Sequence, residues 1–351
     1  MKNEQELYTV DQLPIFQNLM YDSEAEAKAC PKGDVRLVEN LETGLIYNAS
    51  FRPELMVYDA HYQNEQAVSP IFQQHLDSVV KLIKRTMGQE HLVELGCGKG
   101  SFLEILLGAG FDVTGFDPTY EGTNPRITRD YFGPGMGINA NGLVLRHVLE
   151  HIKDPISFLQ HLRKSNGGSG LIYIEVPCFD WICTHRAWFD VFYEHVNYFR
   201  LSDFHRIFDT VIESGHFFGD QYIYVVADLA GLNVPELNAR QHVDFPGDFL
   251  LSLKAQNRTD CKSAVWGGAS KGVIFTLLKL RIGQSVDLII DINPSKQGKY
   301  VPATGLKVYS PENGLARLPK GSTIYVMNSN YREEIKQMSN YAYEYVSVDY
   351  E

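Results

Sequence analysis

Hydrophobic and polar positions follow three successive patterns along the chain. Before residue 69, short strand-like pieces at residues 34–40 and 44–50 are separated by turn residues, without a long helical period. Residues 69–87 then place apolar side chains three and four positions apart, which predicts a helix. Beyond this helix, short apolar runs alternate with helical stretches, a pattern typical of a parallel sheet covered by helices.

Five apolar runs are the expected strands of this sheet. They are residues 91–95, 112–116, 142–146, 171–176 and 221–229, and the last is expected at an antiparallel edge. Residues 231–247 are polar, contain two prolines and predict a linker, after which strand and helix alternate again. The pattern therefore predicts an α/β protein of three domains. These are a small β-rich domain over residues 1–68, a sheet-and-helix domain over residues 69–232 and a second α/β domain over residues 233–351.

Composition narrows the classes of function. The chain has 351 residues, 44% of them hydrophobic, which is enough for two or three cores. Its formal charge of -11 leaves no basic surface for sequence-independent binding of nucleic acid, so a small-molecule partner is expected. No run approaches the roughly 20 apolar residues of a membrane span and the amino terminus is polar, which predicts a cytoplasmic protein without a membrane partner. Five scattered cysteines without a C-x-x-C pair predict reduced thiols.

A glycine-rich segment follows the first expected strand. In HLVELGCGKGSF, residues 91–102, Glu94 ends the strand and Gly96, Gly98 and Gly100 precede a helix. Glycines at this point allow a sharp turn and the close approach of a ligand to the free N–H groups of the helix. The spacing is G-x-G-x-G, which differs from the G-x-G-x-x-G of dinucleotide sites.

A second acidic residue completes this pattern. Asp117 ends the next strand in GFDP, followed by Pro118, where a carboxylate can accept hydrogen bonds from both hydroxyls of a ribose. Together the loop and Asp117 resemble the S-adenosylmethionine site of class I methyltransferases. The resemblance implies a class I methyltransferase Rossmann-like sheet, with S-adenosylmethionine bound by Glu94, the three glycines, Asp117 and Pro118.

The segment RHVLEH, residues 146–151, contains H-x-x-E-H, a pattern of inverted zinc-protease helices. Zinc would require His147 and His151 on one helical face, but a strand precedes them and KDP follows at once, so no metal is predicted. In class I methyltransferases this strand end lies under the methionine part of the cofactor and opens onto the substrate. His147, Glu150 and His151 are therefore pocket candidates, with capping of the next helix as the alternative.

Glu194 and His195 lie side by side among aromatic residues in FDVFYEHVNYF, residues 189–199. One interpretation is a neutral core histidine. The other is a general base, because an aromatic shell disfavours imidazolium and a carboxylate can orient the ring or stabilise its charge. An enolate formed by this base would need a hydrogen-bond donor, for which Tyr193, Tyr198 and His147 are the candidates.

Read together, these segments resemble the three-domain sugar C-methyltransferases of deoxysugar biosynthesis, which methylate a carbon next to a ketone in a nucleotide-linked sugar. The resemblance covers almost the whole chain, through ELGCGKGSFL, GFDP, RHVLEHIKDP, FYEHVNYF, VWGGASKG and IIDINPSKQGK. In that family the Glu-His pair lies on a lid over the cofactor, and the histidine is the proposed base. The resemblance implies these roles for Glu194 and His195.

The sequence departs from that family at two places. Family members usually carry Tyr and His immediately before the Glu-His pair, whereas Phe192 and Tyr193 stand there in this chain. The amino-terminal domain of the family holds zinc through paired cysteines, but Asn40 and Thr43 replace one pair. Without thiolates this site is predicted to bind no zinc.

The last block carries VWGGASKG, residues 265–272, and Asp291 at the end of the following strand. This arrangement resembles half of a dinucleotide fold, so a Rossmann-like carboxy-terminal domain is expected. Lys271 and the loop amides are candidates for the diphosphate of the substrate, and the alternative is a domain that grips substrate without binding a nucleotide. Lys296 and Lys299 are further candidate partners for an anion, and the alternative is that they are solvated lysines of a turn. The expected substrate-binding residues are Tyr198, His151, Lys271 and Asp291.

The resulting hypothesis is S-adenosylmethionine-dependent C-methylation next to a ketone in a nucleotide-linked sugar or related metabolite. One alternative is an O- or N-methyltransferase on the same scaffold. An alternative of another class is a non-catalytic protein that binds S-adenosylmethionine or a nucleotide sugar as a signal. The Glu194–His195 pair favours an enzyme, because a sensor does not require a base.

Overall fold

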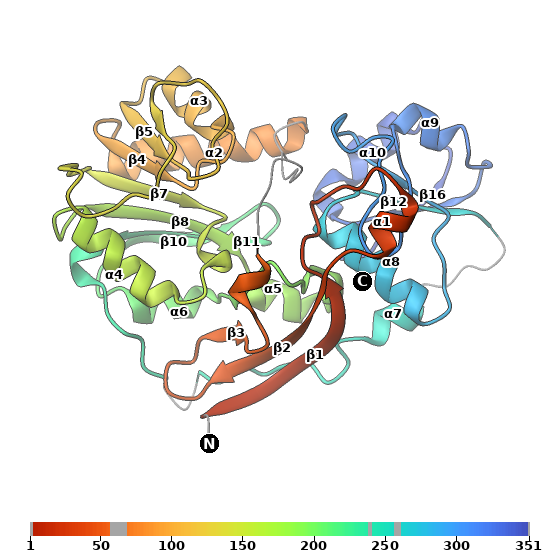
Figure 1. Cartoon of the computed structure of the whole chain (residues 1–351), viewed down its shortest axis with the longest axis horizontal. Helices are drawn as coiled ribbons and strands as arrows, with labels where there is room; N and C mark the ends of the chain where they lie inside the picture. Colours follow the sequence, from red (N-terminus) through yellow and green to blue (C-terminus); the bar gives the residue numbers. More distant parts are fainter. Residues whose placement is uncertain (1–2, 57–68, 238–240, 256–260, 350–351) are drawn as a thin grey trace.

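The computed structural model describes residues 3–56, 69–237, 241–255 and 261–349 (Figure 1). Three separate sheets organise these residues, and β9 (Asn197–Tyr198) is a strand of the first sheet that comes from the central part of the chain. The expected end of the first domain at residue 68 and part of the expected linker, residues 238–240, lie outside the described residues. No described helix is long and apolar enough to span a bilayer.

The amino-terminal sheet borrows a strand from the central part of the chain. Its strands are β1 (Glu4–Pro14), β2 (Lys32–Asn40), β3 (Ile46–Asn48) and β9 (Asn197–Tyr198), with the helix α1 (Glu24–Lys28) between β1 and β2. All neighbours pair antiparallel, and Ile46 lies opposite Tyr198. The segment that follows the Glu-His pair is therefore fixed in the first sheet.

The loop between β2 and β3 is closed without thiolates. The side-chain oxygen of Asn40 accepts hydrogen bonds from the backbone N–H groups of Glu42 and Thr43, at 2.9 and 3.0 Å. This geometry is an Asx turn, in which the asparagine satisfies its own following backbone. Asn40 and Thr43 thus form a hydrogen-bonded turn.

The central sheet is mainly parallel. Its order is β10 (Val211–Phe217), β11 (Tyr222–Asp228), β8 (Leu171–Pro177), β7 (Gly142–Arg146), β4 (Leu92–Leu95), β5 (Val113–Phe116) and β6 (Ile127–Thr128). Figure 1 shows α2 (Pro70–Met87) and α3 (Ser101–Gly108) on one face of this sheet and α4 (Pro155–Ser165) and α6 (Leu201–Ile207) on the other. The predicted helix over residues 69–87 and the predicted strands are confirmed.

The expected position of one strand was wrong. β11 is antiparallel to β8, as predicted, but it is not the edge, because β10 pairs along its outer side. The sequence of β10, VIESGHF, is polar and its side chains are only partly buried or exposed. Its apolar pattern was therefore too weak to reveal a strand.

The carboxy-terminal sheet is entirely parallel. Its order is β14 (Val308–Tyr309), β13 (Leu288–Ile290), β12 (Ser263–Trp266), β15 (Thr323–Val326) and β16 (Glu344–Ser347). The helices of this part are α7 (Leu251–Ala255), α8 (Ser270–Arg281), α9 (Pro311–Leu315) and α10 (Arg332–Met338). A second α/β unit was predicted here, and the parallel sheet confirms it.

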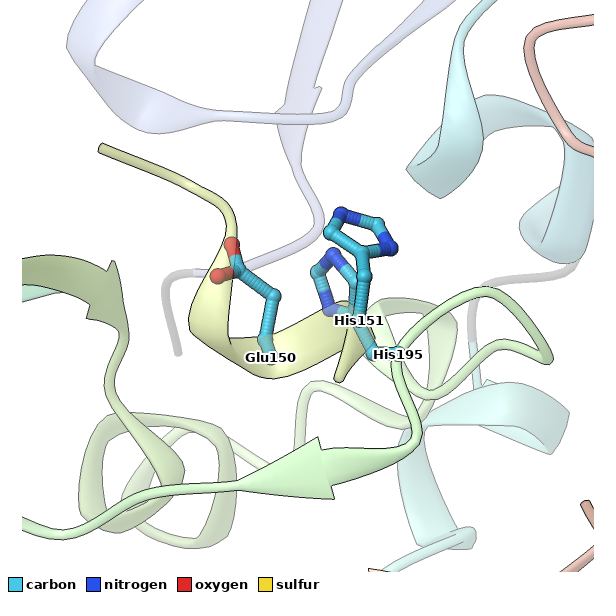
Figure 2. Close-up of side chains that lie close together, drawn as sticks. All are labelled: Glu150, His151 and His195. Carbon is cyan, nitrogen blue, oxygen red and sulfur yellow. The ribbon is translucent and has the colours of Figure 1, made fainter. Parts of the chain in front are cut away.

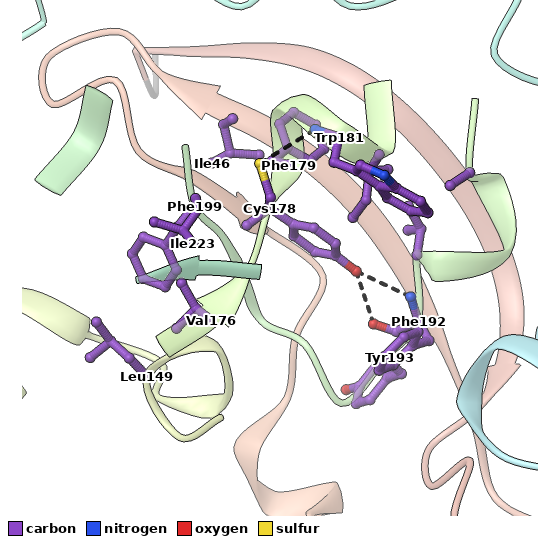
Figure 3. Close-up of a cluster of buried hydrophobic side chains, with 14 of the residues drawn as sticks. Ile46, Leu149, Val176, Cys178, Phe179, Trp181, Phe192, Tyr193, Phe199 and Ile223 are labelled. Carbon is purple, nitrogen blue, oxygen red and sulfur yellow. Dashed lines mark hydrogen bonds between the residues drawn. The ribbon is translucent and has the colours of Figure 1, made fainter. Parts of the chain in front are cut away.

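Aromatic packing joins the central segment to the carboxy-terminal sheet. Trp188 stacks on Phe275 of α8, with 5.5 Å between the ring centroids and an angle of 15° between the planes. The indole N–H of Trp188 donates to the hydroxyl of Ser252, at 2.9 Å. Figure 3 shows Phe192 and Tyr193 within a cluster of buried side chains further along the same segment.

We expect Gly272→Ala to destabilise the carboxy-terminal domain. A Cβ at this position of α8 would overlap the backbone carbonyl oxygen of Gly267. Overpacking against a backbone atom typically costs about 1–3 kcal/mol. Thermal unfolding should show a lower transition temperature. The matched control is Gly108→Ala near the end of α3, where a Cβ meets open space, so its transition should be unchanged or higher.

Candidate active site

The glycine loop has the backbone conformation that its sequence predicts. Gly96, Gly98 and Gly100 have positive φ angles of 66°, 55° and 82°, in the region that favours glycine. Gly100 is the N-cap of α3, and a Cβ added to Gly98 would meet no atom within 4 Å. The loop therefore offers an open backbone surface at the start of a helix, where free N–H groups can bind a ligand.

Asp117 is tied to this loop. Its carboxylate accepts a hydrogen bond from the N–H of Gly98 at 2.8 Å, and its other oxygen accepts from the N–H and hydroxyl of Thr119 at 2.8 and 2.7 Å. The side chain is buried at the end of β5. Asp117 therefore sets the distance between the glycine loop and the neighbouring strand end.

Glu94 is buried below the loop, and one of its carboxylate oxygens has no hydrogen-bond partner among the described residues. Burial raises the pKa of Glu94 to about 7, partly offset by the positive charge of Arg146. A buried carboxylate without a donor is costly, and a cationic ligand group beside it would lower that cost. The loop, Asp117 and Glu94 thus fit a ligand with hydroxyl groups and an ammonium group.

The end of β8 carries a buried carboxylate with several donors. Glu175 contacts Arg146 at 2.9 Å, His75 at 3.1 Å and His147 at 3.0 Å, and it accepts a hydrogen bond from Tyr173. Burial raises the pKa of Glu175, but the guanidinium of Arg146 and the two histidines outweigh it and hold the pKa well below its usual range. Glu175 is therefore the anionic centre that connects β7, β8 and α2.

His147 lies between two carboxylates. Its ring nitrogens are 3.0 Å from Glu175 and 3.4 Å from Glu150, and its φ is 52°, an uncommon conformation for a histidine. Burial lowers its pKa, but the two carboxylates outweigh burial and raise the pKa of His147 to about 9. At neutral pH His147 is accordingly an imidazolium that stacks edge-on against Tyr222.

A cavity of about 280 Å³ lies beside His147. Its walls come from the amino-terminal part through Asn18, from the central part and from the carboxy-terminal part through the glycine loop of α8. Gly96, Gly98, Gly100 and Asp117 are not among its described walls. On the side of the central sheet, the cavity is bordered by His147, directly after β7, and by Glu150 and His151 of the 3-10 turn Leu149–His151.

His195 faces this cavity and is held without charge. It packs on Phe192, with 4.0 Å between ring centroids, and edge-on against His151 at 4.9 Å (Figure 2). Burial lowers the pKa of His195 well below its usual range, and electrostatic repulsion from neighbouring side chains, among them Lys271, lowers it further. The cavity thus contains a neutral histidine close to a protonated one.

Glu194 makes contacts that join domains. One carboxylate oxygen accepts a hydrogen bond from the backbone N–H of Gln17, at 2.8 Å, and its backbone carbonyl accepts one from Nδ1 of His151, also at 2.8 Å. Burial lowers the pKa of the Lys296 amine, and the carboxylates of Asp291 and then Glu194 oppose that shift. Glu194 therefore connects the amino-terminal part, the central part and the carboxy-terminal part around the cavity.

The two tyrosines expected as donors lie elsewhere, and the structure corrects their expected position. The hydroxyl of Tyr193 is bonded to the backbone of Arg52, and that of Tyr198 to the backbone N–H and carbonyl of Phe192. Neither contributes to the described walls of the cavity. Tyr222 lines the cavity instead, and the sequence carried no signal for it because it lies in the middle of an apolar strand pattern.

The carboxy-terminal wall supplies charged groups. Lys271 contacts Asp190 at 3.0 Å and Gln221 at 2.9 Å, and Asp291 accepts a hydrogen bond from the N–H of Gly268 at 2.7 Å. Lys296 is buried and lines the cavity, so the alternative of a solvated lysine does not hold for it. A turn sequence does not show that another domain covers it.

One group of side chains has the composition of a metal site. Glu150, His151 and His195 each place one ligand atom within 4.8 Å of the other two. The H-x-x-E-H spacing suggested only His147 with His151 as ligands, and these residues lie on a short 3-10 turn, Leu149–His151 and its flank, instead of an α-helix. His195 comes from a segment 44 residues later in the chain (195 − 151 = 44), so sequence spacing gave no signal for this group.

Comparisons with known families identify the class of protein. A methyltransferase domain family matches residues 61–211, which include the glycine loop, Asp117 and the Glu-His pair. With the parallel Rossmann-like sheet, this match makes the chain an S-adenosylmethionine-dependent methyltransferase of the class I fold. A second family model, described as a C-methyltransferase C-terminal domain, matches residues 239–346. No curated protein matches the sequence.

Solved structures give weaker likenesses. Magnesium protoporphyrin IX methyltransferase from Synechocystis PCC 6803, with bound S-adenosylhomocysteine, is 16% identical over 45% of this chain and 83% of its own, with a TM-score of 0.35. The 1,6-didemethyltoxoflavin-N1-methyltransferase of Burkholderia thailandensis is 13% identical over 52% and 95%, with a TM-score of 0.34. Values this low carry no information on the substrate of this chain.

We expect the charge of His147 to make stability depend on alkaline pH. Because its pKa is raised to about 9 in the fold, its stabilisation is complete below the ordinary histidine pKa of ~6.5 and is lost as pH rises through 9. Urea unfolding at pH 7 and pH 10 should show a loss of roughly 2–3 kcal/mol that His147→Asn lacks. Asparagine tolerates the positive φ. The exposed His205→Asn should keep the wild-type pH profile.

Proposed function

We propose that the chain transfers a methyl group to a carbon next to a carbonyl, in a nucleotide-linked sugar or related metabolite, with His195 as the general base. The observation that carries the proposal is a neutral, buried histidine on the wall of a cavity that reaches the end of β7. The match of the last third to a C-methyltransferase domain supports carbon as the methylated atom. An O- or N-methyl product would be the alternative outcome.

The methyl donor would be held by the glycine loop and the two acidic strand ends. Bound there, S-adenosylmethionine supplies an electrophilic methyl group. Asp117 is placed to accept hydrogen bonds from ribose hydroxyls, and Glu94 offers an unpartnered oxygen to an ammonium group. Gly96, Gly98 and Gly100 would keep the backbone open to this ligand, and Pro118 and His147 are the further candidates for contact with it.

His195 would remove the proton from the substrate carbon. Its low pKa keeps the lone pair free at neutral pH, and the pKa must rise when substrate binds for the transfer to be favourable. A carbonyl oxygen that becomes anionic beside the ring would supply that rise. His147, as an imidazolium on the cavity wall, is the candidate donor to this oxygen, in place of Tyr193 and Tyr198, and its Nδ1–H would have to turn from Glu150, 3.4 Å away, to reach it.

The anionic end of the substrate would lie against the carboxy-terminal wall. Lys271 and Lys296 supply positive charge there, and the loop before α8 presents backbone N–H groups at a helix start. Asp291 holds this loop through the N–H of Gly268. His151 borders the same cavity beside His195. A diphosphate fits this set of groups, which supports a nucleotide-linked substrate.

The function can be tested by a mass-spectrometric screen. Purified protein is incubated with nucleotide-linked keto sugars and S-adenosylmethionine with a labelled methyl group. The expected result is a product that gains one labelled methyl group on carbon, as read by NMR. A product methylated on oxygen or nitrogen would contradict the role of His195 as a carbon base.

We expect Asp117→Asn to weaken the binding of S-adenosylhomocysteine by about tenfold or more, since a charged acceptor is lost. The single amide oxygen cannot serve both the N–H of Gly98 and the backbone of Thr119 while accepting from a ribose. Isothermal titration calorimetry measures the effect. The exposed Asp130→Asn is the matched control, and equal affinities for both variants would remove the cofactor site from this loop.

We expect His195→Ala to separate binding from turnover. Cofactor affinity should stay within about twofold, because Asp117 and the glycine loop lie elsewhere, whereas methyl transfer should fall about 10²–10⁴-fold. In deuterated water with S-adenosylhomocysteine, the wild type should exchange the proton next to the carbonyl and the variant should not.

A different outcome would identify a core histidine. If His195→Ala loses stability while the folded fraction keeps full activity, the ring is structural and the base must be sought at His151. Circular dichroism and the cofactor affinity of the same samples distinguish the two cases.

A further inference from the structure

Three side chains with metal-ligand chemistry converge on the cavity. Glu150 and His151 come from the turn after β7, and His195 comes from the segment before β9 (Figure 2). One ligand atom of each lies within 4.8 Å of the other two. Zinc and similar ions bind imidazole nitrogen and carboxylate oxygen at ~2.0–2.2 Å, which sets tetrahedral ligands roughly 3.4 Å apart. Small side-chain rotations would therefore complete the site.

The hydrogen bond of His151 leaves its Nε2 available to a metal ion. Its Nδ1 donates to the backbone carbonyl of Glu194 at 2.8 Å, because a carbonyl oxygen only accepts. In the neutral ring this places the lone pair on Nε2. A backbone carbonyl that fixes the tautomer of a histidine in this way is the usual outer partner of a metal-bound imidazole.

Glu150 supplies a buried anion that the fold leaves without a hydrogen bond. Its side chain is 1% exposed, and neither oxygen has a hydrogen-bond partner among the described residues. His147 faces Oε1 at 3.4 Å, which leaves Oε2 for another cation. A buried carboxylate oxygen normally accepts a hydrogen bond or coordinates a metal ion.

His195 supplies the third ligand atom, from a ring that lies edge-on to that of His151 with 4.9 Å between the ring centroids. Lys271 also lines the cavity, and its positive charge repels a metal ion. We therefore expect the affinity to be moderate, in the micromolar range, below that of structural zinc sites.

We propose that Glu150, His151 and His195 bind a divalent first-row transition metal, with zinc as the reference ion, and that this binding inhibits methyl transfer. The metal occupies the lone pair of His195 that would otherwise accept the proton. The inhibition rests on the proposed function, but the binding does not. The enzyme is thus switched off by free zinc and restored by a chelator.

The test measures zinc binding to the full chain by calorimetry, without substrate. Wild-type protein should bind one zinc ion per chain at this site. Glu150→Gln and His151→Gln should each weaken binding by about tenfold or more, while His205→Gln, an exposed histidine, should have no effect. Cobalt bound to the wild type should give the visible absorption of a four-coordinate nitrogen and oxygen site, which does not depend on any variant folding.

The outcomes separate the two proposals. Zinc that binds equally to all variants, or no zinc and no cobalt spectrum, overturns the metal site even when methyl transfer is found. Zinc binding that depends on Glu150 and His151 supports the site even when no methyl acceptor is found. If both activities are present and saturating zinc leaves methyl transfer unchanged, the inhibitory role is overturned.

Discussion

The candidate active site depends on one constraint: the segment from Trp188 to residue 199 is fixed by all three parts of the molecule. Trp188 packs on α8 of the carboxy-terminal domain, Glu194 accepts the backbone N–H of Gln17, and β9 pairs with β3 of the first sheet. The N–H of Val196 also donates to the carbonyl of Glu150, at 2.9 Å. His195 is thereby held against the turn after β7, although its own segment has little regular structure.

Electrostatics then gives two histidines of one cavity opposite protonation states. His147 has carboxylates on both sides and becomes an imidazolium, whereas His195 is surrounded by rings and positive charges and stays neutral. Groups with pKa values pushed apart in this way can act as an acid and a base at the same pH. The buried carboxylate of Glu175 underlies this arrangement, because it compensates both Arg146 and His147.

Several features of the candidate site could not be predicted from the sequence, because they depend on which way a side chain points in the folded protein. Tyr193 and Tyr198 lie close to the Glu-His pair in sequence. Their hydroxyls, however, are hydrogen-bonded to backbone groups, of Arg52 for Tyr193 and of Phe192 for Tyr198. Lys296 stands in a turn sequence, but it is buried, and its amine donates to the side-chain oxygen of Asn18 in the amino-terminal part, at 3.4 Å. Such contacts depend on segments that are far away in the chain, and the local sequence pattern around each residue does not predict them.

The sequence by itself determined the strands of the central sheet, the glycine loop and its acidic partner Asp117, because backbone conformation and alternation of apolar side chains are local properties. It also determined that His195 lies in an apolar shell. Only the tertiary structure decided that β10 forms the edge of the sheet, that Glu194 joins domains, and that Glu150 and His151 face His195. These depend on contacts between segments far apart in the chain, and the free energy that selects such contacts comes from packing of the whole fold rather than from any one segment.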